Sequence, residues 1–248
     1  MIESSLKNKI EFILVEPSHP GNVGASARAI KNMGFDKLCL VNPKSFPDNE
    51  AFFRAKGASN ILDNTKVFKT LDEALKDSTL IFGTSARERS IPWPLRDSDN
   101  LTDIILKELG KRNSKISILF GREESGLSNE ELQKCNYQIK IPSDDSYSSL
   151  NLSHAIQIIS YELKILFDSS EHIIKQTDVE ASTEKEVDFL IKHIDEVMKQ
   201  IDFYDKENPK QVHTRIKKLI KKINLDKMEL GIARGFLSKI EEMLNKKD

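Results

Sequence analysis

The chain has 248 residues, of which 38% are hydrophobic and 31% are charged, with a formal net charge of −1. This composition is typical of a soluble globular protein, and the length allows one large domain or one domain with a smaller companion. It contains no apolar run as long as a membrane span, and its first nine residues lack the apolar core of a signal peptide. We therefore expect a cytoplasmic protein without a membrane partner, in which Cys39 and Cys135 stay reduced.

The charge is distributed unevenly along the chain. Residues 168–205 carry 11 acidic and 4 basic side chains, whereas residues 206–248 carry 12 basic and 6 acidic ones, and residues 1–167 balance. A basic segment after an acidic one suggests an anionic partner, although the net charge is close to zero.

The first two thirds of the chain alternates short apolar runs with helical patterns. The expected strands are residues 10–15, 38–41, 66–68, 80–82, 116–120 and 137–141. The expected helices are residues 22–34, 50–58, 71–76, 99–109, 128–134 and 152–167. Because the strand runs are apolar without strict alternation, we predict an α/β domain whose mostly parallel sheet is covered by helices on both faces.

The pattern changes after residue 167, which gives three predicted parts: a domain at 1–167, an acidic linker at 168–182, and a small all-α domain at 183–248. Thr183 and Glu186 form a capping-box signal at the start of the first of three helices. The second helix, from residue 210, places Val212, Ile216, Leu219, Ile220 and Ile223 on one face, which we expect to be buried. Six bases and no acid occur between residues 210 and 222. We interpret this helix as a phosphate-contacting surface, because like charges this dense repel one another on an ordinary solvated face.

A hydroxyl-rich turn at residues 148–153 joins the predicted strand at 137–141 to the strongly periodic helix that starts at Leu152. Such junctions bind ligands in α/β proteins, since backbone amides at a helix start are free to hydrogen-bond. A helix cap is the simpler interpretation of serine and asparagine at this position. Two further runs favour a binding site: residues 22–28 (NVGASAR) and residues 120–127 (FGREESGL).

Together with Ser149, Leu150 and Asn151, these runs resemble the three ordered motifs of the SPOUT RNA methyltransferases, in the branch that methylates the ribose 2′-hydroxyl. Residues 83–87, 92–94 and 129–132 extend the similarity to a bacterial enzyme of that branch that acts on the tRNA anticodon loop. The resemblance implies a deep trefoil knot at the carboxyl end of the domain, a homodimer with the active site at its interface, and S-adenosyl-L-methionine as cofactor. It implies methylation of a cytidine or uridine at position 32 of tRNA.

The resemblance also assigns roles to individual residues. The implied catalytic group is Asn22, Arg28, Glu123, Ser149 and Asn151. The cofactor would contact three loops, at Thr84, Ser85, Ala86, Gly121, Arg122, Ile141, Ser148, Ser149, Leu150 and Asn151. The tRNA would contact Arg28 and the basic helix at Arg215, Lys217, Lys218, Lys221 and Lys222. The five histidines are scattered and form no ligand cluster, so we predict no metal site.

Several alternatives stay open at this point. A dinucleotide-dependent oxidoreductase is a weaker interpretation, because residues 21–24 lack the G-x-G-x-x-G spacing. A non-catalytic RNA-binding protein with the same fold, or a sister methyltransferase acting on ribosomal RNA or on another tRNA position, remains possible. Arg28 could act as a general base or could stabilise the developing alkoxide electrostatically. The second role fits better the high pKa of a guanidinium, which is above about 12.

Overall fold

The structure, a computed structural model, describes residues 6–85, 95–96, 98–144, 146–169, 177–204 and 211–246. Its centre is a seven-stranded sheet with the order β3-β2-β1-β6-β4-β7-β5. The strands are β1 (Ile10–Val15), β2 (Leu38–Val41), β3 (Lys66–Phe68), β4 (Leu80–Thr84), β5 (Leu95–Arg96), β6 (Ile116–Phe120) and β7 (Tyr137–Ile139). Every described strand pair is parallel, which confirms the predicted class of sheet.

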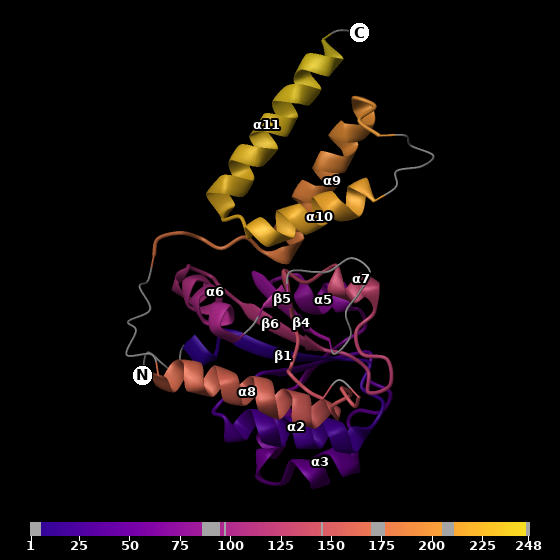
Figure 1. The fold of residues 1–248 in the computed structure, drawn as a ribbon, viewed down its shortest axis with the longest axis vertical. Helices are drawn as coiled ribbons and strands as arrows, with labels where there is room; N and C mark the ends of the chain where they lie inside the picture. The colour runs from indigo at the N-terminus through magenta and orange to yellow at the C-terminus, as the bar shows by residue number, and fades with distance from the viewer. Residues whose placement is uncertain are drawn as a thin grey trace.

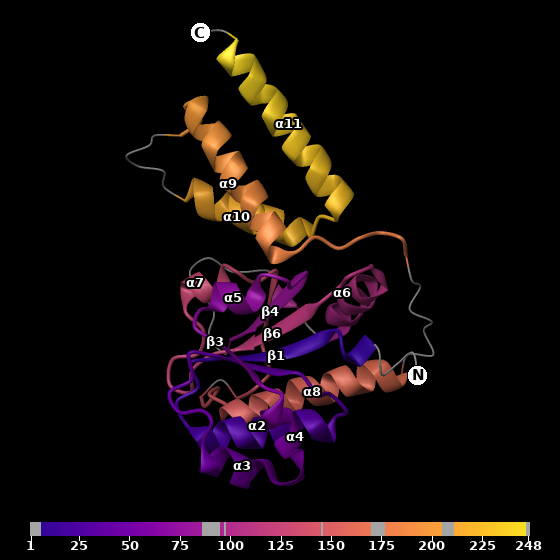
Figure 2. The ribbon, with the colours of Figure 1, turned by 180° about the vertical axis from the view of Figure 1, so that it is seen from behind.

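Helices cover the sheet on both faces, as predicted (Figures 1 and 2). One face carries α2 (Pro20–Asn32), α3 (Asn49–Ala55), α4 (Ser59–Asp63) and α8 (Leu152–Ser169). The other carries α5 (Leu71–Leu75) and α7 (Asn129–Leu132). A short 3-10 turn, η1 (Lys56–Ala58), joins α3 to α4, and α6 (Ser98–Gly110) leads into β6. Apolar side chains such as Phe12, Phe82 and Phe120 are completely or almost completely buried between these layers.

The sequence located most elements and missed a few. It did not predict α4 or the two-residue strand β5, and it ended β4 two residues early and α8 two residues early. The predicted strand at 137–141 is shorter, because β7 ends at Ile139 and Ile141 lies in the following loop. The trefoil knot stays a prediction.

Three helices form the carboxyl-terminal part: α9 (Glu184–Gln200), α10 (Val212–Ile223) and α11 (Lys227–Asn245). They lie together beyond the α5 and α7 side of the sheet (Figures 1 and 2). The capping box predicted at Thr183 and Glu186 is present at the start of α9. The apolar face predicted for α10 is only partly covered, since Leu219 is 52% and Ile223 is 53% exposed. Burial of the whole stripe was therefore a wrong expectation.

Backbone contacts tie the described part of the predicted linker to the first domain. The Arg112 N–H donates to Val179 O (2.8 Å), and the Ala181 N–H donates to Arg112 O (3.1 Å). The Glu184 N–H then donates to Ser78 O (2.6 Å), just before β4. Ala181 and Ser182 are buried. These contacts place the start of α9 at the amino-terminal end of β4.

Candidate functional site

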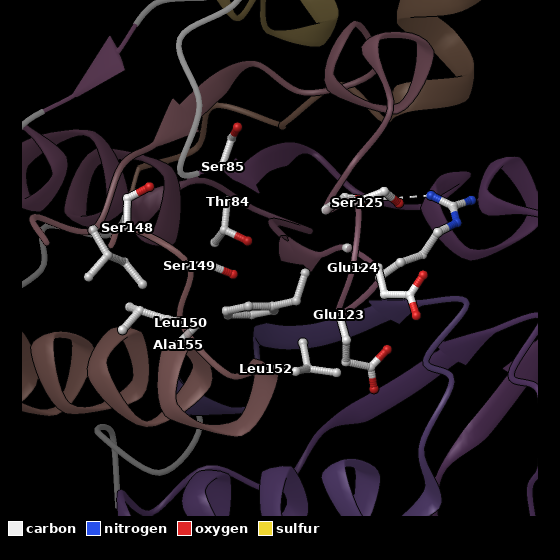
Figure 3. Close-up of a pocket in the computed structure, with 15 residues that line it drawn as sticks. Thr84, Ser85, Glu123, Glu124, Ser125, Ser148, Ser149, Leu150, Leu152 and Ala155 are labelled. Carbon is white, nitrogen blue, oxygen red and sulfur yellow. Dashed lines mark hydrogen bonds between the residues drawn. The ribbon is translucent and has the colours of Figure 1, made fainter. Parts of the chain in front are cut away.

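A cleft lies where three neighbouring strands of the sheet end, and Figure 3 shows the side chains that line it. The loops that follow β4, β6 and β7 form its walls, and the first turns of α8 close it. Carboxyl ends of parallel strands are the usual place for ligands in open α/β sheets. The lining residues are Thr84, Ser85, Phe120, Gly121, Arg122, Glu123, Glu124, Ser125, Gly126, Ile141, Ser148, Ser149, Leu150, Leu152 and Ala155.

Eight of the residues that the sequence assigned to the cofactor line this cleft: Thr84, Ser85, Gly121, Arg122, Ile141, Ser148, Ser149 and Leu150. Asn151 lies beside them at the start of α8, and Ala86 lies outside the described residues. The structure therefore brings three loops that are distant in the sequence to one place. What the lining contributes is a mixture of apolar surface, from Phe120, Ile141 and Leu150, and hydroxyl groups.

Two glycines shape the loop after β6. A Cβ atom on Gly121 would meet the Gly126 carbonyl carbon at 2.0 Å, so the loop can close on itself only with glycine there. Gly126 has φ +68°, a left-handed conformation that glycine adopts without strain. The Gly126 N–H donates to Arg122 O at 2.9 Å and completes the tight turn. The turn places the Glu123 and Glu124 side chains at the mouth of the cleft (Figure 3).

The Glu123 carboxylate connects this turn to the loop between β1 and α2. Oε2 accepts hydrogen bonds from Ser18 N–H (3.0 Å) and Ser18 Oγ–H (2.8 Å). Oε1 accepts from His19 N–H (3.3 Å) and from Asn22 Nδ2 (2.9 Å). Burial alone would raise the pKa of Glu123, but the hydrogen bonds from Asn22 and Ser18 outweigh it and hold that pKa below its usual range. The carboxylate is therefore ionised at neutral pH and acts as a fixed acceptor.

A second contact joins this pair to the hydroxyl-rich turn. Asn151 Nδ2 donates to Asn22 Oδ1 at 3.1 Å. Asn151 Oδ1 in turn accepts from the N–H and Oγ–H of Ser153 at 2.9 and 2.8 Å, the geometry of a helix cap at the start of α8. The helix-cap and binding-site interpretations of this turn are therefore compatible, because Asn151 takes part in both arrangements. Glu123, Asn22 and Asn151 form a continuous chain of hydrogen bonds through all three motifs.

Helix α2 is held in position by features of its own sequence. His19 caps it by accepting from the Gly21 N–H (3.1 Å), and Pro20 occupies its first position. A Cβ atom on Gly24 would meet Ala51 O at 2.0 Å, so this glycine allows α2 and α3 to pack backbone against backbone. Ser26, also buried, donates from Oγ to Asn22 O (2.7 Å). The glycine and serine of the first motif therefore serve packing.

Arg28 lies two turns into α2 with an exposed side chain. It is not among the residues that line the cleft of its own chain. Helix α2 packs against α8, which begins at the cleft (Figure 1). Hydrogen bonds thus join Asn22 to Glu123 and to Asn151, whereas Arg28 is neither a lining residue of the cleft nor a member of that chain of bonds.

The Arg122 side chain is engaged outside the cleft. Its Nε donates to Glu16 Oε2 (2.8 Å), and its two terminal nitrogens bind Glu131 in a bidentate pair at 3.0 Å each. These hydrogen bonds raise the pKa of Arg122 and fix its charge. Only the rest of the residue is left to line the cleft. The guanidinium anchors the turn after β6 to the β1 loop and to α7.

Sequence reasoning missed Ser18, Glu16 and Glu131 as parts of this site. Glu131 had a local signal, because the residue three positions after Ser128 completes a capping box. Glu16 has φ +47°, an unusual conformation that no sequence pattern announces. Ser18 meets Glu123 from 105 positions away, so only the folded chain reveals the contact.

Some basic side chains of α10 lie at the surface, and others are partly or fully buried. Arg215 and Lys222 are exposed, and Lys217 and Lys218 are half-buried. Lys221 is 1% exposed and forms an ion pair with Glu184, which is itself buried. The prediction that Lys221 contacts tRNA therefore needs correction, because its ammonium faces the protein interior. Burial lowers the pKa of Lys217 beside it.

The chemistry of the cleft suits a nucleoside joined to an amino acid. Apolar walls can take an adenine ring, and the loops offer backbone groups and hydroxyls at the rim. The Thr84 hydroxyl is occupied, since it donates to Leu119 O (2.9 Å), and so stabilises the wall. Within the described residues, no cluster of three potential metal ligands occurs, and no helix is long and apolar enough to cross a membrane.

The chain is similar to known proteins over most of its length. Residues 9–161 match the SpoU rRNA Methylase family, and residues 185–248 match the C-terminal domain of the tRNA methyltransferase TrmJ. The chain is 38% identical over 245 residues to the tRNA (cytidine/uridine/adenosine-2'-O-)-methyltransferase TrmJ of Pseudomonas aeruginosa, with 95% of each chain covered. It is 39% identical over 237 residues to the tRNA (cytidine/uridine-2'-O-)-methyltransferase TrmJ of Escherichia coli K12, covering 94% of this chain and 95% of that one. The crystal structure of TrmJ from Z. mobilis superposes with a TM-score of 0.77 at 27% identity, covering 93% of this chain and 98% of that one.

Proposed function

The chain belongs to the SpoU methylase family, and from that premise we propose that it methylates tRNA at a ribose 2′-hydroxyl with S-adenosyl-L-methionine as donor. We propose a cytidine or uridine at position 32 of the anticodon loop as the target. Support comes from the two relatives that match more than 90% of the chain. Both are named as tRNA 2′-O-methyltransferases for cytidine and uridine, and the name of the Pseudomonas aeruginosa relative adds adenosine. The observation that carries the proposal is the chain of hydrogen bonds from Glu123 through Asn22 to Asn151.

Methyl transfer to a hydroxyl requires two reactants in line and a route for the hydroxyl proton. When bound, S-adenosyl-L-methionine supplies a methyl group that its sulfonium charge has already activated. Ser148, Ser149 and Leu150 would hold it on one side of the cleft, with Thr84, Ser85 and Gly121 opposite. The amides of Asn22 and Asn151 stand at the mouth, where they can orient a ribose. Glu123 holds Asn22 in that orientation and is too acidic to serve as the base at neutral pH.

Arg28 is the residue that we expect to face the ribose and its phosphate during transfer. Its side chain is exposed and does not line the cleft of its own chain. This separation fits a homodimer in which Arg28 of one protomer works at the cleft of the other. We propose that arrangement, in the cytoplasm. Arg28 would stabilise the developing alkoxide, since a guanidinium is a poor proton acceptor.

We propose that the two ends of the chain divide the work. Residues 1–167 would bind the cofactor and carry out catalysis, and residues 183–248 would bind tRNA, with residues 168–182 as the connection. The candidate tRNA contacts on α10 are Arg215, Lys217, Lys218 and Lys222. Lys221 is not among them, because its side chain is buried.

Mass spectrometry of nucleosides tests the proposal directly. The full chain is incubated with unmodified tRNA and methyl donor, and the digested product should contain 2′-O-methylcytidine or 2′-O-methyluridine. Mass spectrometry of larger nuclease fragments of the same tRNA should place the methyl group at position 32. Ribosomal RNA fragments serve as the competing substrate. Methylation of ribosomal RNA in preference to tRNA would overturn the substrate assignment, while an inert protein that binds tRNA would overturn the enzyme assignment. S-Adenosylhomocysteine should raise the melting temperature, and NAD should leave it unchanged.

Variants of Arg28 separate its two possible roles. Arg28→Ala should lower the rate by about a hundredfold to a thousandfold, the usual loss on removing a group that stabilises transition-state charge, and leave cofactor binding unchanged. Arg28→Lys keeps the charge but loses the planar fork, so an electrostatic role predicts little rescue and a flat pH profile. A rate that recovers and rises toward high pH would instead indicate a base. Wild-type activity in Arg28→Ala would show that Arg28 is not part of the active site.

A further inference from the structure

A tyrosine at the edge of the cleft has no role in the account given so far. Tyr147 is 80% exposed, more than any other large apolar side chain among the described residues. The residues that follow it, Ser148, Ser149 and Leu150, line the cleft. Consecutive Cα atoms are about 3.8 Å apart, so the Cα atom of Tyr147 lies about that distance from the Cα atom of Ser148, which belongs to the cleft wall.

The backbone around Tyr147 is held in place although the ring is free. The Tyr147 N–H donates to Asp144 O (3.1 Å), and the Ser146 N–H donates to Asp144 Oδ1 (2.8 Å). On the other side, Ser143 Oγ donates to Ser148 O (3.3 Å). The Ser146 hydrogen bonds keep the pKa of the Asp144 carboxyl below its usual range, so this turn persists at neutral pH. A fixed turn therefore presents an uncovered aromatic ring at the rim.

An aromatic ring in this position matches the substrate class already proposed. Single-stranded RNA loops are recognised by splaying bases out and stacking them on aromatic side chains. Such a contact accepts any base, because every base has a flat π-face, and is worth about 1–3 kcal/mol per base. Methyl transfer to the ribose 2′-hydroxyl does not use the base of that nucleotide, so the base is available for a stacking contact.

We propose that Tyr147 is a substrate-positioning residue that stacks on an unpaired base of the anticodon loop and so holds the target ribose over the cleft. This inference rests on the proposed function, because it requires an RNA loop as the substrate. Its phenolic hydroxyl is dispensable in this role, and the flat ring is what matters. The tyrosine thus acts on RNA binding and leaves the cofactor untouched.

Kinetics with the full chain test the proposal. Tyr147→Ala should lower kcat/KM for tRNA by about 5-fold to 150-fold, chiefly through KM, which is the stacking energy converted at 1.4 kcal/mol per tenfold. Tyr147→Phe should stay within a few-fold of the wild type. Phe53→Ala removes another exposed ring, 67% exposed on α3, and should change nothing. The Kd for S-adenosylhomocysteine and the mass by light scattering should be the same in all variants.

Three results would overturn the inference: unchanged kcat/KM in Tyr147→Ala, an equal loss in Tyr147→Phe, or a loss that comes with weaker cofactor binding or a changed oligomeric state. A fluorescence measurement separates this failure from failure of the proposed function. In a Trp93→Phe background, Tyr147→Trp carries the chain's one tryptophan at the rim, and an anticodon stem-loop RNA should quench its emission. Quenching without methyl transfer supports stacking and contradicts the reaction. Methyl transfer without quenching contradicts stacking alone.

Discussion

The two halves of the molecule are held together by different forces. In the first, strands β1 and β6 are buried in full, and apolar clusters fill both faces of the sheet. In the second, the described residues from 184 to 246 bury only a few large apolar side chains: Leu190, Ile191, Val197, Met198 and Leu230. Large apolar side chains on α11 remain open, among them Ile232 at 69% and Phe236 at 67% exposure.

Polar contacts replace that missing core at the border between the halves. Asn136 Nδ2 donates to Lys221 O (2.9 Å), and Asn224 Nδ2 donates to Glu108 Oε2 (3.0 Å). Within the helical half itself, the buried Lys221 side chain pairs with Glu184. Burial raises the pKa of Glu184, while the Lys221 charge works in the opposite direction. The catalytic half is therefore stabilised by its own interior, whereas the helical half depends on where it docks. Four measurements test this difference between the halves.

The largest effect is expected on separating the helical half. A fragment of residues 183–248 keeps the Lys221–Glu184 pair but loses its hydrogen bonds to Asn136, Glu108 and Ser78. Its few buried apolar groups cannot offset the entropy of ordering the chain. It should show no cooperative transition in thermal circular dichroism. Addition of the separate fragment 1–182 is the control. A sharp transition in the isolated fragment would show that the helical half has a sufficient core.

Breaking the buried ion pair should weaken docking in the intact chain. Glu184→Ala leaves the Lys221 charge buried without its partner, which typically costs about 3–5 kcal/mol. Urea unfolding followed by hydrogen exchange should show the loss in α9 and α10 and little change in β1 and β6. Lys222→Ala, at the exposed neighbouring position, is the matched control. Glu184→Leu combined with Lys221→Met should recover most of the stability, and failure of that rescue would argue against the ion pair as the cause.

A smaller loss is expected at the junction of the three motifs. Glu123→Gln keeps the shape but replaces one charged acceptor by a donor, so Ser18 or Asn22 loses its partner at a cost of about 1–3 kcal/mol. The melting temperature should fall and the activity should drop. Because the pKa of Glu123 lies below its usual range, its contribution is present at neutral pH and is lost only as the pH falls through that low value. The pH profile of the variant between pH 6 and 9 should thus parallel the wild type, and a changed profile there would give Glu123 a role in proton transfer.

The smallest effect is expected on shortening the chain to the catalytic half. A fragment ending at Ser169 contains the whole sheet, both apolar clusters and α8. Its melting temperature and its Kd for S-adenosylhomocysteine should stay near those of the full chain, while its affinity for tRNA should fall. Calorimetry of the two proteins side by side provides the measurement. Unfolding of the fragment at room temperature would mean that the helical half supports the sheet.

The same contrast explains what the sequence predicted well. Apolar runs located β1, β2 and β6 to the residue, because a strand buried on both faces leaves an uninterrupted signal. The capping box predicted at Thr183 is equally local, and it is present. Two of the motif runs, at residues 120–127 and 148–153, contribute lining residues to the cleft, because strand ends in a parallel sheet meet at one edge.

The failures all involve partners that are far apart in the chain. Helical periodicity shows that α10 has an apolar and a basic face, but it does not show that Lys221 turns inward to meet Glu184. It does not show either that Leu219 stays half-exposed. The motif that contains Arg122 does not show either that its guanidinium pairs with Glu16 and Glu131, since only the folded chain brings these carboxylates to it.

The position of β6 between β1 and β4 has a consequence for how the protein is made. β1 pairs with β6 from Ile10 opposite Ile116 onward, and Glu16 and Arg122, at the ends of these strands, are 106 residues apart. At about 5–20 residues per second, a ribosome needs roughly 5 to 20 s to supply β6 after β1 has emerged. During that time β1 can pair with β2 alone, and its other edge is open to any passing strand. The nascent chain should therefore be most prone to aggregation before residue 120 has left the ribosome, and the methyl-donor cleft comes into existence only after that moment.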